Sequence, residues 1–137
     1  MKASYKIDEI TPGMSASTSH VVTDEDIRKF AEVSGDHNPV HLDDVYAGES
    51  RYGRRIAHGL FGASFFSGLF GTKLPGRGCV YAAQNLKFRR PVFIGDTLVA
   101  TVTVISVDPP RKRVMFSTVC TVAGKEVIIG DAEIFIP

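Results

Sequence analysis

An aspartate and a histidine stand five residues apart in the stretch GDHNPVHLD, residues 35–43, on either side of Asn38 and Pro39. A carboxylate and an imidazole that face one water can divide its chemistry, because one accepts a proton while the other supplies one to a neighbouring carbon. The plainer interpretation is that an aspartate and an asparagine before a proline only close a turn through bonds from their side chains to the backbone. Asp36 and His41 are therefore candidates whose role depends on what surrounds them.

His58 and Gly59 form a second pair of interest, at the start of an apolar run. The first amides of a helix have no acceptor within it and carry partial positive charge, and a glycine lets a ligand oxygen approach. Such an amide can stabilise a carbonyl that gains negative charge, as in a thioester enolate. With Asp36 and His41, these parts suit the addition of water to a double bond conjugated with a carbonyl. The alternative is that His58 only packs or caps, and that Gly59 admits a neighbouring strand.

The elements that position these residues follow from the hydrophobic period along the chain. We expect a strand near residues 14–22, then a short amphipathic helix with Thr23 as its N-cap and Gly35 as its end. Residues 36–41 are expected to form a turn or irregular loop, since Pro39 disfavours a helical conformation for the residue before it. A short helical turn over residues 42–47 and a polar loop over residues 48–55 follow.

Residues 57–73 predict a helix that is apolar nearly all round and is therefore surrounded by protein. The period then changes to two, which predicts antiparallel strands over residues 79–88, 96–107, 113–122 and 125–136. Only the apolar helix can cover the inner face of such a sheet. The predicted fold class is α+β, with an antiparallel sheet wrapped around a long central helix in a single domain, residues 1–137.

Composition narrows the classes of function. A net charge of +1 over 137 residues supplies no field for a nucleic-acid backbone or an anionic membrane, so neither partner is expected. The apolar run is shorter than the roughly 20 residues that a bilayer requires. Cys79 and Cys120 have no CxxC spacing, and the N-terminal residues lack the apolar segment of a signal peptide. Free buried thiols and a cytoplasmic location are the expectation.

Three segments together resemble the MaoC-like (R)-specific enoyl-CoA hydratases, also called hydratase 2. They are SGDHNPVHLD, RRIAHGLFGASFFSGLFGTKLPG and QNLKFRRPVFIGDTL, in the same order and spacing as in that family. The resemblance covers nearly the whole chain and implies a hot-dog fold, a sheet curled around one long helix. It also implies a homodimer whose sheets join edge to edge, with acyl-CoA near the subunit interface.

The resemblance assigns roles to residues of this chain. It implies catalytic roles for Asp36 and His41, a loop shaped by Asn38 and Pro39, a thioester-binding amide at Gly59, and support of the site by Ser67. His58 is placed with the substrate-binding residues. Coenzyme A carries phosphates, and the arginines near the motifs are candidates to meet them: Arg54, Arg55, Arg89 and Arg90. No metal or redox cofactor is expected.

The expected reaction is the reversible syn hydration of a trans-2-enoyl-CoA to the (R)-3-hydroxyacyl-CoA, with Asp36 as base and His41 orienting the water. Three alternatives remain open: a hot-dog thioesterase, an acyl carrier protein dehydratase, and a non-catalytic acyl-CoA-binding module. The pathway is equally open, with polyhydroxyalkanoate precursor supply one candidate. The aromatic residues of the apolar helix favour short to medium acyl chains.

Overall fold

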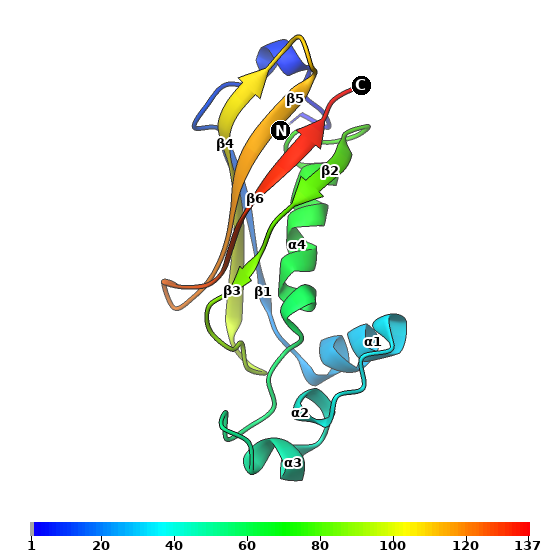
Figure 1. The fold of residues 1–137 in the computed structure, drawn as a ribbon, viewed down its shortest axis with the longest axis vertical. Coiled ribbons are helices and arrows are strands. Elements are labelled where there is room, and N and C mark those ends of the chain that lie inside the picture. The colour runs from blue at the N-terminus through cyan, green and yellow to red at the C-terminus, as the bar shows by residue number, and fades with distance from the viewer. Residues whose placement is uncertain (1) are drawn as a thin grey trace.

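The structure, a computed structural model, describes residues 2–137 as one sheet around one long helix, with short helices at one end (Figure 1). The helical elements are η1 (Ile7–Glu9), α1 (Asp24–Ser34), α2 (Pro39–Leu42), α3 (Asp44–Gly48) and α4 (Gly59–Thr72). The strands are β1 (Ser15–Val21), β2 (Val80–Gln84), β3 (Lys87–Phe88), β4 (Thr97–Asp108), β5 (Arg113–Val122) and β6 (Lys125–Phe135).

The strands within residues 2–137 form one six-stranded antiparallel sheet in the order β1-β4-β5-β6-β2, with β3 also paired to β6. The strand expected over residues 79–88 is divided into β2 and β3. At the division, the backbone of Asn85 comes so close to Gly130 of β6 that a Cβ there would lie 2.0 Å from the Asn85 carbonyl oxygen. The continuous strand was therefore a wrong prediction. Residues 85 and 86 leave the regular ladder where the Asp131 amide donates to the Asn85 side-chain oxygen, although the Asn85 amide still donates to the Asp131 carbonyl oxygen.

Helix α4 covers the concave side of the sheet, as predicted, and its bounds lie within one or two residues of those expected. It is not surrounded by protein within this one chain, because Leu60, Ser64 and Ser67 are exposed. Phe66, Leu69 and Phe70 are buried, and the Phe70 ring packs edge-on against Phe116 of β5 at 4.8 Å between centroids. Burying one such side chain stabilises the fold by about 1.5–3 kcal/mol. A sheet curled around one long helix is the hot-dog architecture, and the expected α+β class is observed.

Helices α1, α2 and α3, called the short helices below, precede α4 and lie beyond its N-terminus, whereas η1 lies at the opposite end of the molecule (Figure 1). Helix α1 begins with the reciprocal hydrogen bonds of Thr23 and Asp26, and Gly35 ends it in the left-handed conformation at φ +79°. The loop expected over residues 36–41 is partly helical, because Pro39 is the first residue of α2 and the Asn38 side chain accepts from the Val40 amide. Proline suits the first position of a helix, where no amide donor is needed.

The two cysteines are free, as expected, but only Cys120 is buried and Cys79 is half-buried. Cys120 on β5 faces the Gly62 carbonyl oxygen, and burial raises the pKa of its thiol to about 12. Burial also raises the pKa of the Cys79 thiol. Among residues 2–137, no helix has the length and hydropathy required to cross a membrane.

Candidate active site

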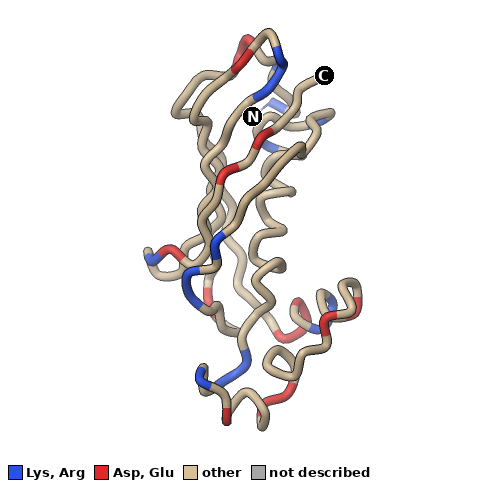
Figure 2. Tube along the Cα trace, in the orientation of Figure 1, with Lys and Arg blue, Asp and Glu red and all other residues tan. Residues whose placement is uncertain are grey.

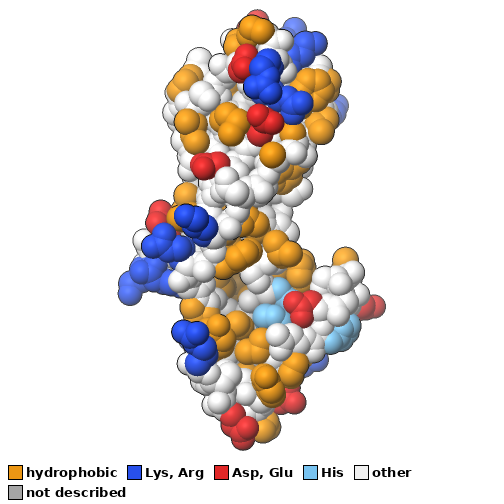
Figure 3. Space-filling view, viewed as in Figure 1, with side chains coloured by type: hydrophobic (Ala, Val, Ile, Leu, Met, Phe, Trp, Pro, Cys, Tyr) orange, Lys and Arg blue, Asp and Glu red, His pale blue; other side chains and the backbone are white. Residues whose placement is uncertain are grey.

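A cavity of about 740 Å³ opens where the short helices meet the N-terminal end of α4 and strand β3. Figure 3 shows this hollow lined mainly by hydrophobic side chains, with histidine on one side and a basic flank on the other. Its inner wall includes Leu98 and Ile128 from the sheet, and Asp36, His41 and Gly59 lie on its surface. The cavity therefore collects residues that the sequence placed in two separate motifs.

Asp36 and His41 face one another across the cavity wall. The Asp36 Oδ2 and His41 Nε2 atoms are 3.9 Å apart, which is too long for a direct hydrogen bond. The His41 side chain is 10% exposed and the Asp36 side chain is 48% exposed. A water molecule at hydrogen-bond distance from both atoms fits this separation.

The orientation of His41 is fixed by a hydrogen bond from its Nδ1 to the Ile56 carbonyl oxygen, 2.7 Å away. Because a carbonyl only accepts, Nδ1 carries a proton, and the tautomer with this proton presents a lone pair at Nε2. His41 therefore meets the cavity as a hydrogen-bond acceptor, as the Asp36 carboxylate also does.

His58 is buried against both members of this pair. Its Nε2 donates to the Asp36 carbonyl oxygen at 3.0 Å, and its ring stacks on the His41 ring at 3.9 Å between centroids. Its Nδ1 has no hydrogen-bond partner among the described residues. Burial lowers the pKa of His58, against the opposing effect of the bond to the Asp36 carbonyl, so the ring is held neutral.

Gly59 is the first residue of α4, and His58, its N-cap, makes no side-chain capping bond. The amide of a first helical residue has no acceptor within its own helix, so the Gly59 N–H is a free donor in the cavity wall. A Cβ at Gly59 would lie 2.7 Å from the Phe88 ring, which makes the close approach expected of this glycine. The N–H and the positive end of the helix can together bind a carbonyl oxygen.

The four candidate arginines occupy different environments. Arg89 and Arg90 line the cavity, and Figure 2 shows the basic segment around β3 beside the open side of the fold. Arg54 is exposed and lies over the Phe93 ring at 4.0 Å from its centroid. Arg55 is only 7% exposed and donates to Asp24 and to the His41 carbonyl oxygen, so its guanidinium has no free face for a phosphate. The phosphate-binding expectation for Arg55 is corrected by this burial.

The remaining candidate residues lie at the edge of the site or outside it. Asn38 and Pro39 shape the chain between Asp36 and His41 and begin α2. Ser67 is exposed on α4, two turns beyond Gly59, and is not among the residues that line the cavity. Within this one chain, the structure therefore does not bring Ser67 to Asp36 and His41.

Several cavity residues carried no signal in the sequence. Phe30 of α1 packs on His58, with 4.9 Å between ring centroids, and Phe88 of β3 packs against Gly59. Arg51 and Tyr52 also line the cavity, from the polar loop before α4. Aromatic and basic residues are common in helices and loops, so only the tertiary arrangement distinguishes these four.

Asp36, His41 and His58 offer ligand atoms within 4.8 Å of one another, which raises the question of a metal site. A metal ion lies in the plane of each imidazole ring that binds it, whereas the His41 and His58 rings stack with only 27° between their planes. This geometry suits a hydrogen-bonded pair that holds water better than a shared metal ion.

A hot-dog sheet with an acid, an imidazole and a helix-start amide around one cavity can bind a polarised carbonyl compound beside an activated water. The MaoC like domain matches residues 8–129, and the chain belongs to the MaoC-like family. An (R)-specific enoyl-CoA hydratase of Rhodospirillum rubrum is 48% identical over 133 residues, covering 97% of this chain and 92% of that protein.

Solved structures give the same relationship. An (R)-hydratase from Aeromonas caviae involved in PHA biosynthesis superimposes with a TM-score of 0.91 at 35% identity, covering 93% of this chain and 98% of that one. The unliganded R-hydratase PhaJ1 from Pseudomonas aeruginosa gives a TM-score of 0.91 at 40% identity, with coverage of 96% and 84%. The hot-dog fold is therefore shared along almost the whole chain.

Proposed function

We propose that the protein is an (R)-specific enoyl-CoA hydratase that reversibly adds water to a trans-2-enoyl-CoA. The observation that carries this proposal is the 3.9 Å separation of Asp36 Oδ2 and His41 Nε2, in a cavity that also holds the Gly59 amide. The hydratases of R. rubrum, A. caviae and P. aeruginosa described above support the substrate class.

The two acceptors explain how a water becomes a nucleophile. Its two O–H bonds point at Asp36 Oδ2 and His41 Nε2, which leaves an oxygen lone pair to attack C3 of the enoyl group. The Gly59 N–H binds the thioester oxygen and stabilises the enolate that forms. Asp36 takes one proton from the water and returns it to C2 on the same face, while His41 keeps the new hydroxyl oriented. The net result is syn addition of one water, with no redox change.

The test is the absorbance of the conjugated enoyl thioester when purified protein meets crotonyl-CoA, followed by chiral analysis of the product. We expect loss of the absorbance and formation of (R)-3-hydroxybutyryl-CoA. No loss with crotonyl-CoA or with longer enoyl-CoAs would refute the proposal. Formation of the (S) isomer would refute the stereochemical part alone.

Two rival activities are separated by the substrate offered. A thioesterase would release free CoA from a saturated acyl-CoA, which a thiol reagent detects. An acyl carrier protein dehydratase would prefer the carrier-borne thioester, so the ratio of kcat/KM for CoA and carrier substrates decides between them. A non-catalytic acyl-CoA-binding module would bind without turnover, and it gives no reason for the paired acceptors of Asp36 and His41.

Recognition of coenzyme A is proposed to involve the basic rim of the cavity. Arg89 and Arg90 border the cavity from one side and Arg51 from another, and Arg54 lies nearby on the same loop as Arg51. Guanidinium groups bind phosphates with paired hydrogen bonds. Replacing both Arg89 and Arg90 with glutamine is expected to raise KM for crotonyl-CoA about tenfold or more, with little change for the phosphate-free pantetheine thioester. Equal changes for both substrates would contradict this role.

A homodimer is proposed from the surface of the sheet. β2 is at one end of the strand order, and its residues Val80 to Ala83 are exposed. The opposite edge strand, β1, has the polar sequence SASTSHV. An exposed apolar edge invites pairing with a second chain, whereas a polar edge discourages it. A cytoplasmic location and a supply of hydroxyacyl precursors for polyhydroxyalkanoate remain proposals that accompany this activity.

A further inference from the structure

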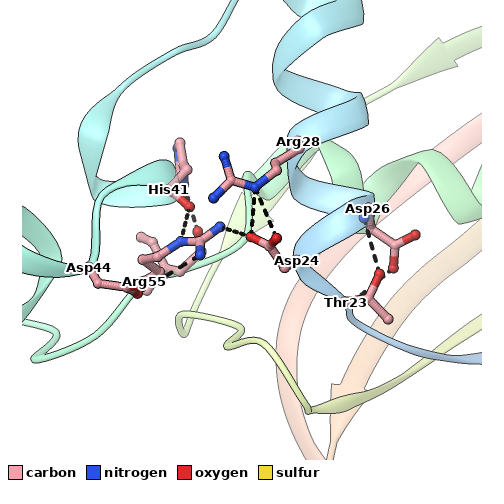
Figure 4. Close-up of polar contacts among 8 residues, drawn as sticks. Thr23, Asp24, Asp26, Arg28, His41, Asp44 and Arg55 are labelled. Atoms are coloured by element: carbon pink, nitrogen blue, oxygen red, sulfur yellow. Dashed lines mark hydrogen bonds and ion pairs between the residues drawn. The ribbon is translucent and has the colours of Figure 1, made fainter.

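Arg55 joins three of the short helices around the catalytic histidine (Figure 4). Its Nε donates to the His41 carbonyl oxygen at 2.7 Å, and its Nη2 donates to Asp24 Oδ1 at 2.5 Å. Its Nη1 lies 3.9 Å from Asp44 Oδ1. Asp24 begins α1, His41 lies in α2 and Asp44 begins α3, so one buried side chain reaches all three elements.

Helix α2 needs such an external contact because it is only four residues long. A single turn fixes several backbone dihedral angles for one hydrogen bond and is unfavourable by itself. His41 lies in the last turn of α2, where the carbonyl oxygens accept no hydrogen bond from amides of the same helix. The Arg55 guanidinium binds one of these carbonyl groups and places a positive charge at the negative end of the turn.

The contact is coupled to the side chain of His41 through the next residue. Ile56 follows Arg55 in the chain and accepts the His41 Nδ1 proton at 2.7 Å. Residues 55 and 56 therefore hold His41 at two points, the main-chain carbonyl and the ring. If Arg55 no longer holds the His41 carbonyl oxygen, the His41 backbone can shift. The ring then no longer keeps Nδ1 within hydrogen-bond distance of the Ile56 carbonyl oxygen or Nε2 facing Asp36.

Burial holds the Arg55 guanidinium in one position between Asp24 and the His41 carbonyl oxygen. The Arg55 side chain is 7% exposed, and a buried guanidinium requires both a counter-charge and satisfied donors. Asp24 supplies the counter-charge, and Arg55 in turn lowers the pKa of the Asp24 carboxyl, with a smaller effect from Arg28. Arg28 pairs with the same carboxylate but is 57% exposed and lies four residues away on the α1 surface.

We propose that Arg55 is a positioning residue for the hydration, which fixes the place and tautomer of His41 through the His41 carbonyl oxygen. The inference rests on the proposed roles of Asp36 and His41. Arg55 does not touch the cavity or the substrate, and its effect is on kcat rather than on KM.

The variants that test this are Arg55→Met, Arg55→Lys and, as a matched control, Arg28→Met. Methionine keeps the aliphatic length and removes both hydrogen bonds. Lysine keeps the charge beside Asp24, but its single ammonium cannot serve Asp24 and the His41 carbonyl in the fixed fork of a guanidinium. The Arg28 variant removes an ion pair to the same aspartate without any contact to His41.

We expect Arg55→Met to lower kcat by at least about tenfold, since small misplacements of a catalytic group cost one to two orders of magnitude. Arg55→Lys should recover the melting temperature but not kcat, and Arg28→Met should keep both near the native values. Full recovery of kcat in the lysine variant would overturn the proposal, because the charge alone would then suffice. If Arg55→Met does not fold, the lysine variant decides.

A substrate-free readout separates this proposal from the proposed activity. The chain has four histidines, so ring ¹⁵N spectra of histidine-labelled protein are simple to assign. Native His41 and the Arg28 variant should report protonated Nδ1 and unprotonated Nε2, whereas both Arg55 variants should report mixed tautomers. Unchanged His41 signals in folded Arg55→Met would overturn the positioning role. Inactive native protein with these tautomer shifts would overturn only the proposed hydration.

Discussion

Asp36 and His41 are useful as a pair only while both remain acceptors. We expect Asp36→Asn and His41→Asn each to lower kcat at least about a hundredfold, because general acid–base groups contribute on that order. Asparagine at position 41 places an amide near the former Nδ1 and so retains a donor for the Ile56 carbonyl oxygen. Initial rates with crotonyl-CoA measure the effect, and circular dichroism checks the fold.

The neighbouring histidine supplies the control for this pair. His37 lies between Asp36 and Asn38 but is exposed, and its Nδ1 contacts only the Gly35 carbonyl oxygen. His37→Gln should keep native kcat. Full activity in either Asp36→Asn or His41→Asn would remove that residue from the proposed mechanism.

His58 gives a prediction about stability at mild acid pH. Its folded-state pKa lies below the ordinary value of 6.5, so the unfolded chain binds a proton first as the pH falls. The free energy of unfolding should therefore decrease as the pH drops from 7.5 to about 5.5, since stability rises with pH where the unfolded state binds more protons. Urea midpoints of native protein and His58→Phe at both values measure this contribution.

The phenylalanine variant keeps a ring for the stack on His41 and removes the titration. Its midpoint should fall less with acid than that of the native protein. Asp24 and Asp26 do not contribute to this change, because the pKa values of their carboxyl groups are lowered from 3.8. The stability that these carboxylates provide is lost only as the pH falls through 3.8 and below. Equal pH slopes in the two proteins would contradict a lowered pKa for His58.

At the level of elements, two glycines of α4 predict opposite phenotypes. A Cβ at Gly62 would lie 2.9 Å from Ile128 Cδ1, and Ile128 is 2% exposed. Gly62→Ala should therefore lower the free energy of unfolding by about 1–3 kcal/mol, as overpacking of a core does. A Cβ at Gly59 would meet Phe88, which is 51% exposed and can move.

Gly59→Ala should consequently cost little stability but lower kcat/KM for crotonyl-CoA by about tenfold, since the displaced ring reshapes the cavity while the amide remains. Denaturant titration and initial rates on both variants give the comparison. A Gly59→Ala protein that is strongly destabilised, or a Gly62→Ala protein that is not, would contradict the assigned environments.

Hydrophobic periodicity predicted the elements whose pattern of apolar and polar residues is the same along their whole length. Helix α4 is apolar on all sides, β4 and β5 alternate, and Thr23 with Gly35 bounds α1, so the sequence was sufficient for these. Helix α2 was missed because Pro39 was interpreted as a breaker, although it is also a good first helical residue. The break between β2 and β3 depends on contact with a strand 45 residues later, and no local pattern contains that information.

The same division applies to the site. The positions of Asp36, His41 and Gly59 on one cavity followed from motifs, and their chemical roles remain predictions. The role of Arg55 did not follow, since its partner Asp24 is 31 residues away and its burial arises only in the folded chain. An arginine in a polar, basic loop has the same sequence signature whether it is exposed or enclosed.

For the whole molecule, the exposed β2 edge gives a test of the proposed homodimer. Val80 is 47% exposed on β2, and Ile105 is 50% exposed on β4, away from that edge strand. Val80→Lys should raise the dimer dissociation constant at least about tenfold, because a charge at an apolar interface loses its hydration. Ile105→Lys should leave it unchanged. Sedimentation velocity over a dilution series distinguishes the two, and equal behaviour would argue against pairing through β2.

The two free thiols, Cys120 buried and Cys79 half-buried, also determine how the protein can be handled. A disulfide reagent reacts with thiolates, and the raised pKa values of Cys79 and Cys120 keep both in the protonated form near neutral pH. Colorimetric reagents for free CoA should therefore give little background from buried Cys120, and a protein blank measures the contribution of the half-buried Cys79. Hydration and thioester cleavage can then be followed in one cuvette, and the enzyme should keep its activity in aerated buffer without added reductant.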